Sequence, residues 1–169
     1  MKQRLYLFVG YPGAGKTTVA KLIQAATGAV HIWSDHERLK MFGEPTHEID
    51  ESKQLYAALN ARTDALLQAG RSVVFDTNFN HRADRDRLRK IAEASGAETV
   101  VVWINTPQNV AKQRAVHDAN LRNGYKMVMT EKHFDEIAAK LEPPTPDENP
   151  IILDGSDLDV SYAKSQLGL

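Results

Sequence analysis

Residues 10–18 read Gly10-Tyr11-Pro12-Gly13-Ala14-Gly15-Lys16-Thr17-Thr18, and this stretch decides the fold. It fits the pattern G-x-x-x-x-G-K-[ST] of a phosphate-binding loop. An apolar run over residues 5–9 leads into the loop, and an amphipathic stretch from Lys16 to Ala26 leads out of it. A strand, a glycine loop and a helix in this order turn backbone N–H groups towards one point, where they bind phosphate oxygens. The sequence therefore predicts a nucleoside triphosphate site; a glycine turn before an ordinary helix is the weaker alternative.

Each position of the loop has an expected role at that site. The glycines permit the tight curl, Lys16 would reach the β- and γ-phosphates, and the Thr17 hydroxyl would ligate Mg²⁺. The expected cofactors are thus ATP and Mg²⁺. We expect ATP to be bound by Gly13, Ala14, Gly15, Lys16, Thr17 and Thr18.

Composition limits the remaining classes of protein. The 169 residues are 42% hydrophobic and 25% charged, which suits a single domain over 1–169 with its own core. There is no cysteine, so thiolate catalysis and cysteine-ligated zinc are excluded. The net charge of -1 gives no overall basic field for nucleic acid. The apolar run after Lys2 and Arg4 is too short for a signal peptide and no stretch has membrane-spanning length, so we expect no membrane contact and a cytoplasmic location.

Apolar runs alternate with helical patterns along the chain. Strands are expected at 5–9, 29–33, 72–76, 99–104 and 150–154. Helix starts are expected at the caps Ser34 (with Glu37), Asp50, Asn80, Thr106, Thr130 and Ser156. Nearly unalternating strands separated by helices indicate a buried parallel sheet. The predicted fold is α/β: a three-layer P-loop NTPase or kinase fold, with a five-stranded parallel sheet, helices on both faces and a small lid over about 114–129.

Two of the strands end in aspartate, and either could face the metal. Asp76 ends the third strand, which lies beside the first in P-loop kinases, whereas Asp154 precedes Gly155 and suits a turn. We therefore assign Asp76, together with Thr17, to Mg²⁺. The alternative is that Asp76 only caps the turn that follows it.

The residues after Asp76 favour a hydroxyl acceptor over water. NTPases that use water usually carry a second carboxylate or a glutamine to orient it, and here Thr77 follows. A hydroxyl acceptor needs a base, and Asp35 follows the second strand at the same edge of the sheet, with Arg38 one helical turn further on. We expect Asp35 to be catalytic and both residues to bind the acceptor. The alternative is that Asp35 only complements the dipole of the helix that it begins.

Other polar features carry less information. The basic run over residues 82–90 is interrupted by Asp84 and Asp86, which indicates a solvated face with i,i+4 pairs rather than a nucleic-acid contact. The six histidines lack metal spacing, so surface positions are expected, with His36 and His117 as the candidates for the cleft.

Taken together, residues 10–18, Asp35-x-x-Arg38, Asp76-Thr77-Asn78 and Arg85 resemble the small P-loop kinases grouped with the bacteriophage polynucleotide 5′-kinase domain. The likeness covers nearly the whole chain and is weakest after Leu121. It implies that Asp35 is the general base on the acceptor hydroxyl. It also implies that Arg38 helps to hold an acceptor phosphate.

The same resemblance extends to the lid and to a proline-rich loop. Lid arginines contact the transferring phosphate in that family, and Arg114 and Arg122 match the region. The sequence departs from the family at His117-Asp118, where a second arginine is common. We expect Arg122 to be catalytic and Arg114 to bind the nucleotide. The loop ending in Glu148 resembles the family segment near the adenine.

Three functions remain open. The leading one is an ATP-dependent kinase that moves the γ-phosphate to a 5′-hydroxyl of a nucleic acid or nucleotide. The second is a kinase of a small hydroxylated metabolite or antibiotic. The third is a nucleotide-binding module without turnover, which Asp35-x-x-Arg38 disfavours because a switch needs no acceptor base. The near-zero net charge favours a small acceptor, and the family likeness favours a polynucleotide.

Overall fold

A computed structural model describes residues 2–118 and 129–169. Its strands pair in parallel and form one sheet in the order β2-β3-β1-β4-β5. They span Arg4–Val9 (β1), Val30–Trp33 (β2), Val73–Asp76 (β3), Glu98–Ile104 (β4) and Ile151–Leu153 (β5). All five predicted strands are therefore present, each within two residues of its expected ends.

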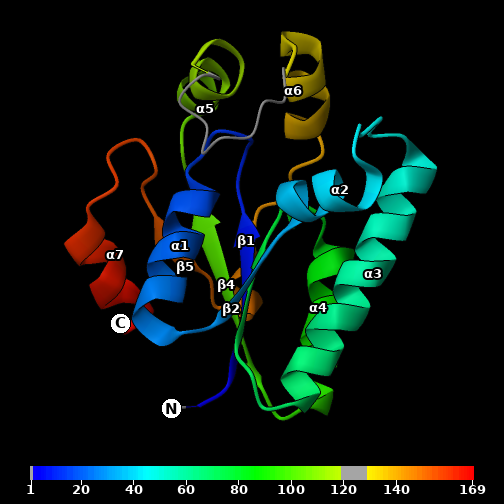
Figure 1. The fold of residues 1–169 in the computed structure, drawn as a ribbon. Coiled ribbons are helices and arrows are strands. Elements are labelled where there is room, and N and C mark those ends of the chain that lie inside the picture. The colour runs from blue at the N-terminus through cyan, green and yellow to red at the C-terminus, as the bar shows by residue number, and fades with distance from the viewer. Residues whose placement is uncertain (1, 119–128) are drawn as a thin grey trace.

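Helices cover both faces of this sheet, which confirms the three-layer prediction (Figure 1). The helices α1 and α7 lie on one face, and α3 and α4 lie on the other. The shorter elements α2, α5 and α6 lie beyond the carboxyl ends of the strands. The bounds are Lys16–Thr27 (α1), Ser34–Phe42 (α2), Ile49–Gln68 (α3), Arg82–Ala94 (α4), Gln108–Lys112 (α5), the π-helical turn Gln113–His117 (η1), Glu131–Ala138 (α6), the 3-10 turn Pro146–Glu148 (η3) and Val160–Leu167 (α7).

Strand β1 shows why the sequence has no polar alternation here. Its residues Tyr6 and Phe8 pack towards α1, while Leu5 and Leu7 pack towards α3 and α4, and all four are buried. Burying one such side chain contributes roughly 1.5–3 kcal/mol. A central strand with helices on both faces therefore reads as a continuous apolar run.

Most of the predicted helix caps are wrong, although the helices exist. Thr130 does cap α6, since its hydroxyl accepts the His133 N–H at 3.1 Å. Ser34 and Asp50 instead lie inside the first turns of α2 and α3, and neither helix has a side-chain cap. Helix α7 begins after Asp159, whose carboxylate accepts the Tyr162 N–H, and Ser156 lies before it in a turn.

Two further predicted caps hold the phosphate loop instead of a helix. The Asn80 side-chain oxygen accepts the Gly10 N–H at 3.2 Å, and α4 begins after His81. The Thr106 hydroxyl donates to the Ala14 carbonyl at 2.8 Å. Both side chains therefore hold the backbone of residues 10–14 in place.

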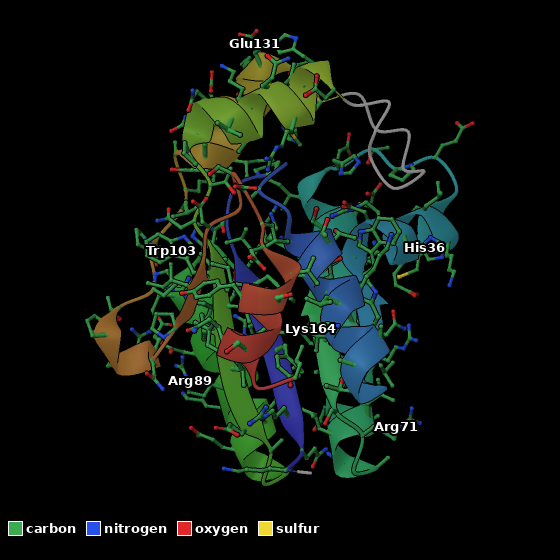
Figure 2. The ribbon with its side chains drawn as sticks, turned by 90° about the vertical axis from the view of Figure 1, so that its left-hand side faces the viewer. His36, Arg71, Arg89, Trp103, Glu131 and Lys164 are labelled. Atoms are coloured by element: carbon green, nitrogen blue, oxygen red, sulfur yellow. The ribbon has the colours of Figure 1, made fainter. Side chains whose placement is uncertain are left out.

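The basic run on α4 is also less solvated than predicted. Arg85 is fully buried and donates to both carboxylate oxygens of Glu148, at 2.8 and 2.9 Å. Arg82 does form the expected i,i+4 pair, with Asp86. The proline-rich loop ending in Glu148 is therefore bound to α4, and Arg89 of α4 also donates to Glu148. Figure 2 shows Arg89 on the opposite side of the view from His36.

The predicted lid over 114–129 falls mainly on residues 119–128, outside the described residues, and Arg122 falls there too. Its described start, η1, continues α5 without a break. The elements on either side pack together through a small apolar cluster of Ala111, Ala115, Met129, Phe134 and Ala138.

Candidate active site

The loop between β1 and α1 is shaped for an anion. Gly13 has a φ of +79°, and a side chain there would press into the Ala111 carbonyl, so only glycine fits. The Lys16 ammonium donates to the carbonyls of Gly10 and Tyr11, at 3.0 and 2.7 Å. Helix α1 has neither a side-chain cap nor an acidic residue in its first turn. The positive end of its dipole is therefore available to phosphate.

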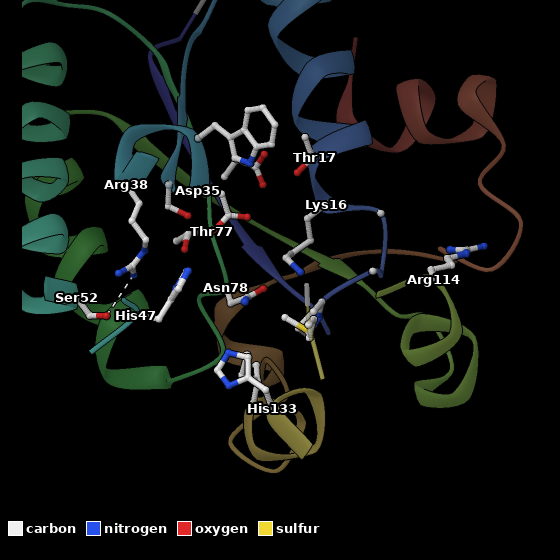
Figure 3. Close-up of a pocket in the computed structure, with 18 of the residues that line it drawn as sticks. Lys16, Thr17, Asp35, Arg38, His47, Ser52, Thr77, Asn78, Arg114 and His133 are labelled. Carbon is white, nitrogen blue, oxygen red and sulfur yellow. Dashed lines mark hydrogen bonds between the residues drawn. The ribbon is translucent and has the colours of Figure 1, made fainter. Parts of the chain in front are cut away.

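A cavity of about 860 Å³ opens in front of this loop. It is bounded by the loop itself, by α2 and α3, by the turn after β3, and by α6 (Figure 3). Its volume lies in the range of small-molecule sites. Most of the predicted site residues line it: Gly13, Gly15, Lys16, Thr17, Thr18, Asp35, Arg38, Asp76 and Arg114. Ala14 does not, because its side chain is buried against the core.

The two predicted metal ligands, Thr17 and Asp76, line this cavity together. Asp76 is buried, and its Oδ2 lies 3.1 Å from His31 Nε2. The described chain holds no cluster of three or more metal-ligating His or acidic side chains. Mg²⁺ in nucleotide sites takes one or two protein oxygens and completes its shell with phosphates and water, so these residues fit it. His31 was missed from sequence, since nothing in its spacing links it to a residue 45 positions away.

Arg38 is bound differently from what the family resemblance implies. Its guanidinium donates to Glu51 Oε1 at 2.5 Å and to Ser52 Oγ at 3.2 Å, both on α3. Glu51 also accepts the N–H groups of Thr46 and His47. Burial opposes its ionisation, but the hydrogen bonds from Thr46 and Arg38 lower the pKa of Glu51 to about 2. The positive charge of Arg38 is therefore neutralised before any acceptor arrives.

The wall around Arg38 also contains residues that sequence patterns did not single out. Tyr56 and Thr77 share a hydrogen bond of 2.9 Å between α3 and the turn after β3. Three histidines line the cavity, namely His47, His81 and His133. The expected His36 and His117 do not line it. These side chains add polar groups to the lining of the cavity.

The opposite end of the cavity is held by Arg114. Its guanidinium donates to the carbonyls of Gly155 and Ser156, at 2.6 and 3.0 Å. Figure 3 shows it on the far side of Lys16 from Arg38. Gly155 in turn packs so closely on Thr106 and the Ala14 carbonyl that a Cβ would clash with both.

Comparison with known proteins places this arrangement in a family. Residues 5–144 match the family model described as an AAA domain. The chain belongs to this AAA domain family. A shikimate kinase of Persephonella marina is 27% identical to this chain over 118 residues, which cover 69% of each of the two chains.

Solved structures share its fold. A sugar kinase of Janibacter sp. HTCC2649 has a TM-score of 0.70 at 22% identity, over 99% of this chain and 95% of that one. The APS kinase of Mycobacterium tuberculosis, in complex with AMPPNP and APS, has a TM-score of 0.69 at 19% identity, over 99% and 96%. In the described part of the chain, no helix is long and apolar enough to cross a membrane.

Proposed function

We propose that this protein is a kinase that transfers the γ-phosphate of ATP to a hydroxyl group of a small molecule. The observation that carries the proposal is the shared cavity, in which the phosphate loop and Asp35 come from different elements and face the same space. A nucleotide-binding module without turnover needs only the loop. The names of the similar proteins, a shikimate kinase, a sugar kinase and an APS kinase, support phosphate transfer to a small acceptor.

The charges of the described residues favour a small acceptor over the polynucleotide 5′-hydroxyl expected from the family likeness. Arg38, expected to hold an acceptor phosphate, is already paired with Glu51. On α4, Arg82 pairs with Asp147, and both Arg85 and Arg89 pair with Glu148. Nucleic-acid sites need unpaired cations along the strand. Three arginines of α4, the best basic candidate, are thus neutralised by neighbouring carboxylates.

The loop would handle the nucleotide mainly by positioning it. Lys16 would exchange its two carbonyl partners for oxygens of the β- and γ-phosphates, and α1 would direct its N-terminus at the same groups. Mg²⁺, held by Thr17 and Asp76, would neutralise charge on the phosphates. The contact between His31 and Oδ2 of Asp76 would orient the Asp76 carboxylate towards the metal. Arg114 would hold the nucleotide end, and Arg122 is proposed to act on the transferring phosphate.

On the acceptor side, Asp35 would receive the hydroxyl proton as the oxygen attacks the γ-phosphorus in line. Asp35 lies in the first turn of α2, two residues after the end of the edge strand β2, so a rigid element sets its position. Helix α6 and η1 pack together above the loop and would help to exclude water, so that ATP is not simply hydrolysed.

An acceptor screen with γ-labelled ATP tests the proposal. The panel contains shikimate, sugars and sugar alcohols, and a 5′-hydroxyl oligonucleotide, with Mg²⁺ present throughout. We expect label on a small acceptor, none on the oligonucleotide, and loss of transfer in a folded Lys16→Ala variant. Label on the oligonucleotide alone would restore the polynucleotide kinase interpretation. ATP binding without transfer to any acceptor would indicate a binding module.

A further inference from the structure

The acceptor side of the cavity is organised around the Glu51 carboxylate. Its two oxygens accept hydrogen bonds from the Arg38 guanidinium, the Thr46 hydroxyl and the N–H groups of Thr46 and His47. These contacts tie α2, the segment 43–48 and α3 into one wall. All the acceptor positions of the carboxylate are used within the protein, so Glu51 builds this wall and does not itself bind the acceptor.

His47 is the residue of this segment that faces the cavity. Its φ is +59°, a left-handed conformation that is uncommon for a residue with a side chain. The turn brings the His47 N–H to Glu51 and places the imidazole among the cavity residues near Ser52 and Arg38 (Figure 3). Glycine would make the same turn without strain. The backbone by itself therefore does not call for a histidine.

The chemistry of this wall is that of a neutral hydrogen-bonding surface. Burial and the Arg38 guanidinium lower the pKa of His47, so the ring is uncharged near neutral pH and offers one donor and one acceptor. Arg38, the cation that this wall contributes to the cavity lining, is paired with Glu51. A hydroxyl group, which also donates and accepts, matches this surface, whereas a carboxylate or phosphate would lack an uncompensated cation here.

We propose that His47 is a specificity-determining residue that binds a second hydroxyl group of the acceptor, which is therefore an uncharged polyol. The inference rests on the proposed kinase function, with Asp35 serving the hydroxyl that reacts. Glu51 is a positioning residue, because it acts through the segment that carries His47. The competing source of specificity is Lys140, which lines the cavity from beyond α6 and would favour an anionic acceptor.

Replacing His47 tests its role without disturbing the turn. His47→Gly keeps the left-handed backbone and removes the imidazole, and His47→Asn keeps both the backbone and a hydrogen-bonding group. The acceptor is whichever compound wild type phosphorylates best in the screen. His47→Gly should raise its KM by about 10-fold, the loss of one hydrogen bond in a site. The KM for ATP and the melting temperature should stay at their wild-type values, and His47→Asn should recover part of the loss.

The matched control is Asn149→Gly, which replaces the other described non-glycine residue of positive φ, at +46° and outside the cavity. It should leave the acceptor KM unchanged. A His47→Gly protein with a wild-type acceptor KM would overturn the inference while leaving the kinase function intact. If no hydroxylated compound is phosphorylated, both the kinase function and the inference fall.

Matched acceptors test the charge. Glucitol and gluconate share a chain of hydroxyl groups and differ in one carboxylate, as do xylitol and xylonate. We expect the higher kcat/KM for the neutral member of a pair. Preference for the carboxylate member, abolished by Lys140→Ala, would assign specificity to Lys140 and contradict the polyol assignment.

Discussion

At the scale of single residues, polar side chains with the pattern of helix caps hold the phosphate loop instead. Asn80 binds the Gly10 N–H across 70 positions of sequence, and Thr106 binds the Ala14 carbonyl across 92. Each residue does precede a helix, so the local pattern predicted a cap. The partner that it binds in the fold is too distant in sequence for such a pattern to reveal.

Gly155 is a second support of that loop, and its replacement has a definite expected result. In Gly155→Ala the new methyl group would collide with the Thr106 hydroxyl and the Ala14 carbonyl, and the latter is backbone that cannot rotate away. We expect a loss of about 1–3 kcal/mol in unfolding free energy, as for overpacked sites, and weaker ATP binding because the loop must shift. Thermal unfolding and calorimetric titration with Mg-ATP measure the two effects.

Gly28→Ala is the control for that substitution. Gly28 ends α1 in the left-handed conformation and has open space around its Cα. Alanine there strains the backbone without touching the loop. Stability should fall while ATP affinity stays constant, and equal losses of ATP affinity in both variants would argue against a contact role for Gly155.

The Glu51 carboxylate predicts a dependence of stability on pH. Its folded pKa is about 2, below its ordinary value of 4.5, because hydrogen bonds from Thr46 and Arg38 outweigh burial. The unfolded chain therefore binds a proton first as the pH falls. The stabilisation from Glu51 is complete above pH 4.5 and is lost between 4.5 and 2. The difference in unfolding free energy between wild type and Glu51→Gln should accordingly be constant from pH 7 to 5 and shrink towards pH 3, as measured by urea unfolding. A difference that is constant down to pH 3 would contradict this.

At the scale of elements, α4 and the loop ending in Glu148 form one unit. Arg85 and Glu148 are both buried and make two hydrogen bonds to each other, and Arg85 also donates to the Phe79 carbonyl at 2.8 Å. The sequence showed an alternation of arginine and aspartate typical of a solvated helix face. It could not show that a glutamate 63 positions away would bury one of those arginines.

Breaking this buried pair should lower the free energy of unfolding strongly, whereas replacing both of its members with apolar residues should lower it much less. Glu148→Leu leaves the Arg85 charge buried without its carboxylate, and such losses typically reach about 3–5 kcal/mol. The double variant Arg85→Met/Glu148→Leu removes both charges, so most of that loss should be recovered. Asp84→Asn, which breaks an exposed pair with Arg87, should change stability by less than about 1 kcal/mol. Denaturant unfolding measures the stability of the three variants. A double variant no more stable than Glu148→Leu would contradict the claim that the unpaired Arg85 charge causes the loss.

At the scale of the whole molecule, alternation of apolar runs and helices was sufficient to predict the parallel sheet and its layers. The edge at which the site lies was also predictable, because a parallel sheet gathers its strand ends and Asp76 and Asp35 follow two of them. The wall formed by α2, the segment 43–48 and α3 could not be predicted from the sequence. The hydrogen bonds of Arg38 to Glu51 and of Tyr56 to Thr77 join elements whose packing no local pattern encodes. Charge pairing there turned an expected phosphate-binding arginine into part of the wall.

The central claim, phosphate transfer to a hydroxyl with Asp35 as base, is tested most directly by the transfer rate of Asp35→Asn. ATP affinity and melting temperature are measured on the same preparation. We expect kcat to fall by about 10²- to 10⁴-fold, because an amide cannot take the proton of the acceptor. ATP affinity should stay at its wild-type value, and stability should change by at most about 1 kcal/mol of helix-dipole interaction. A folded, ATP-binding Asp35→Asn protein with the wild-type transfer rate would contradict the claim and leave Asp35 only a helix-dipole role.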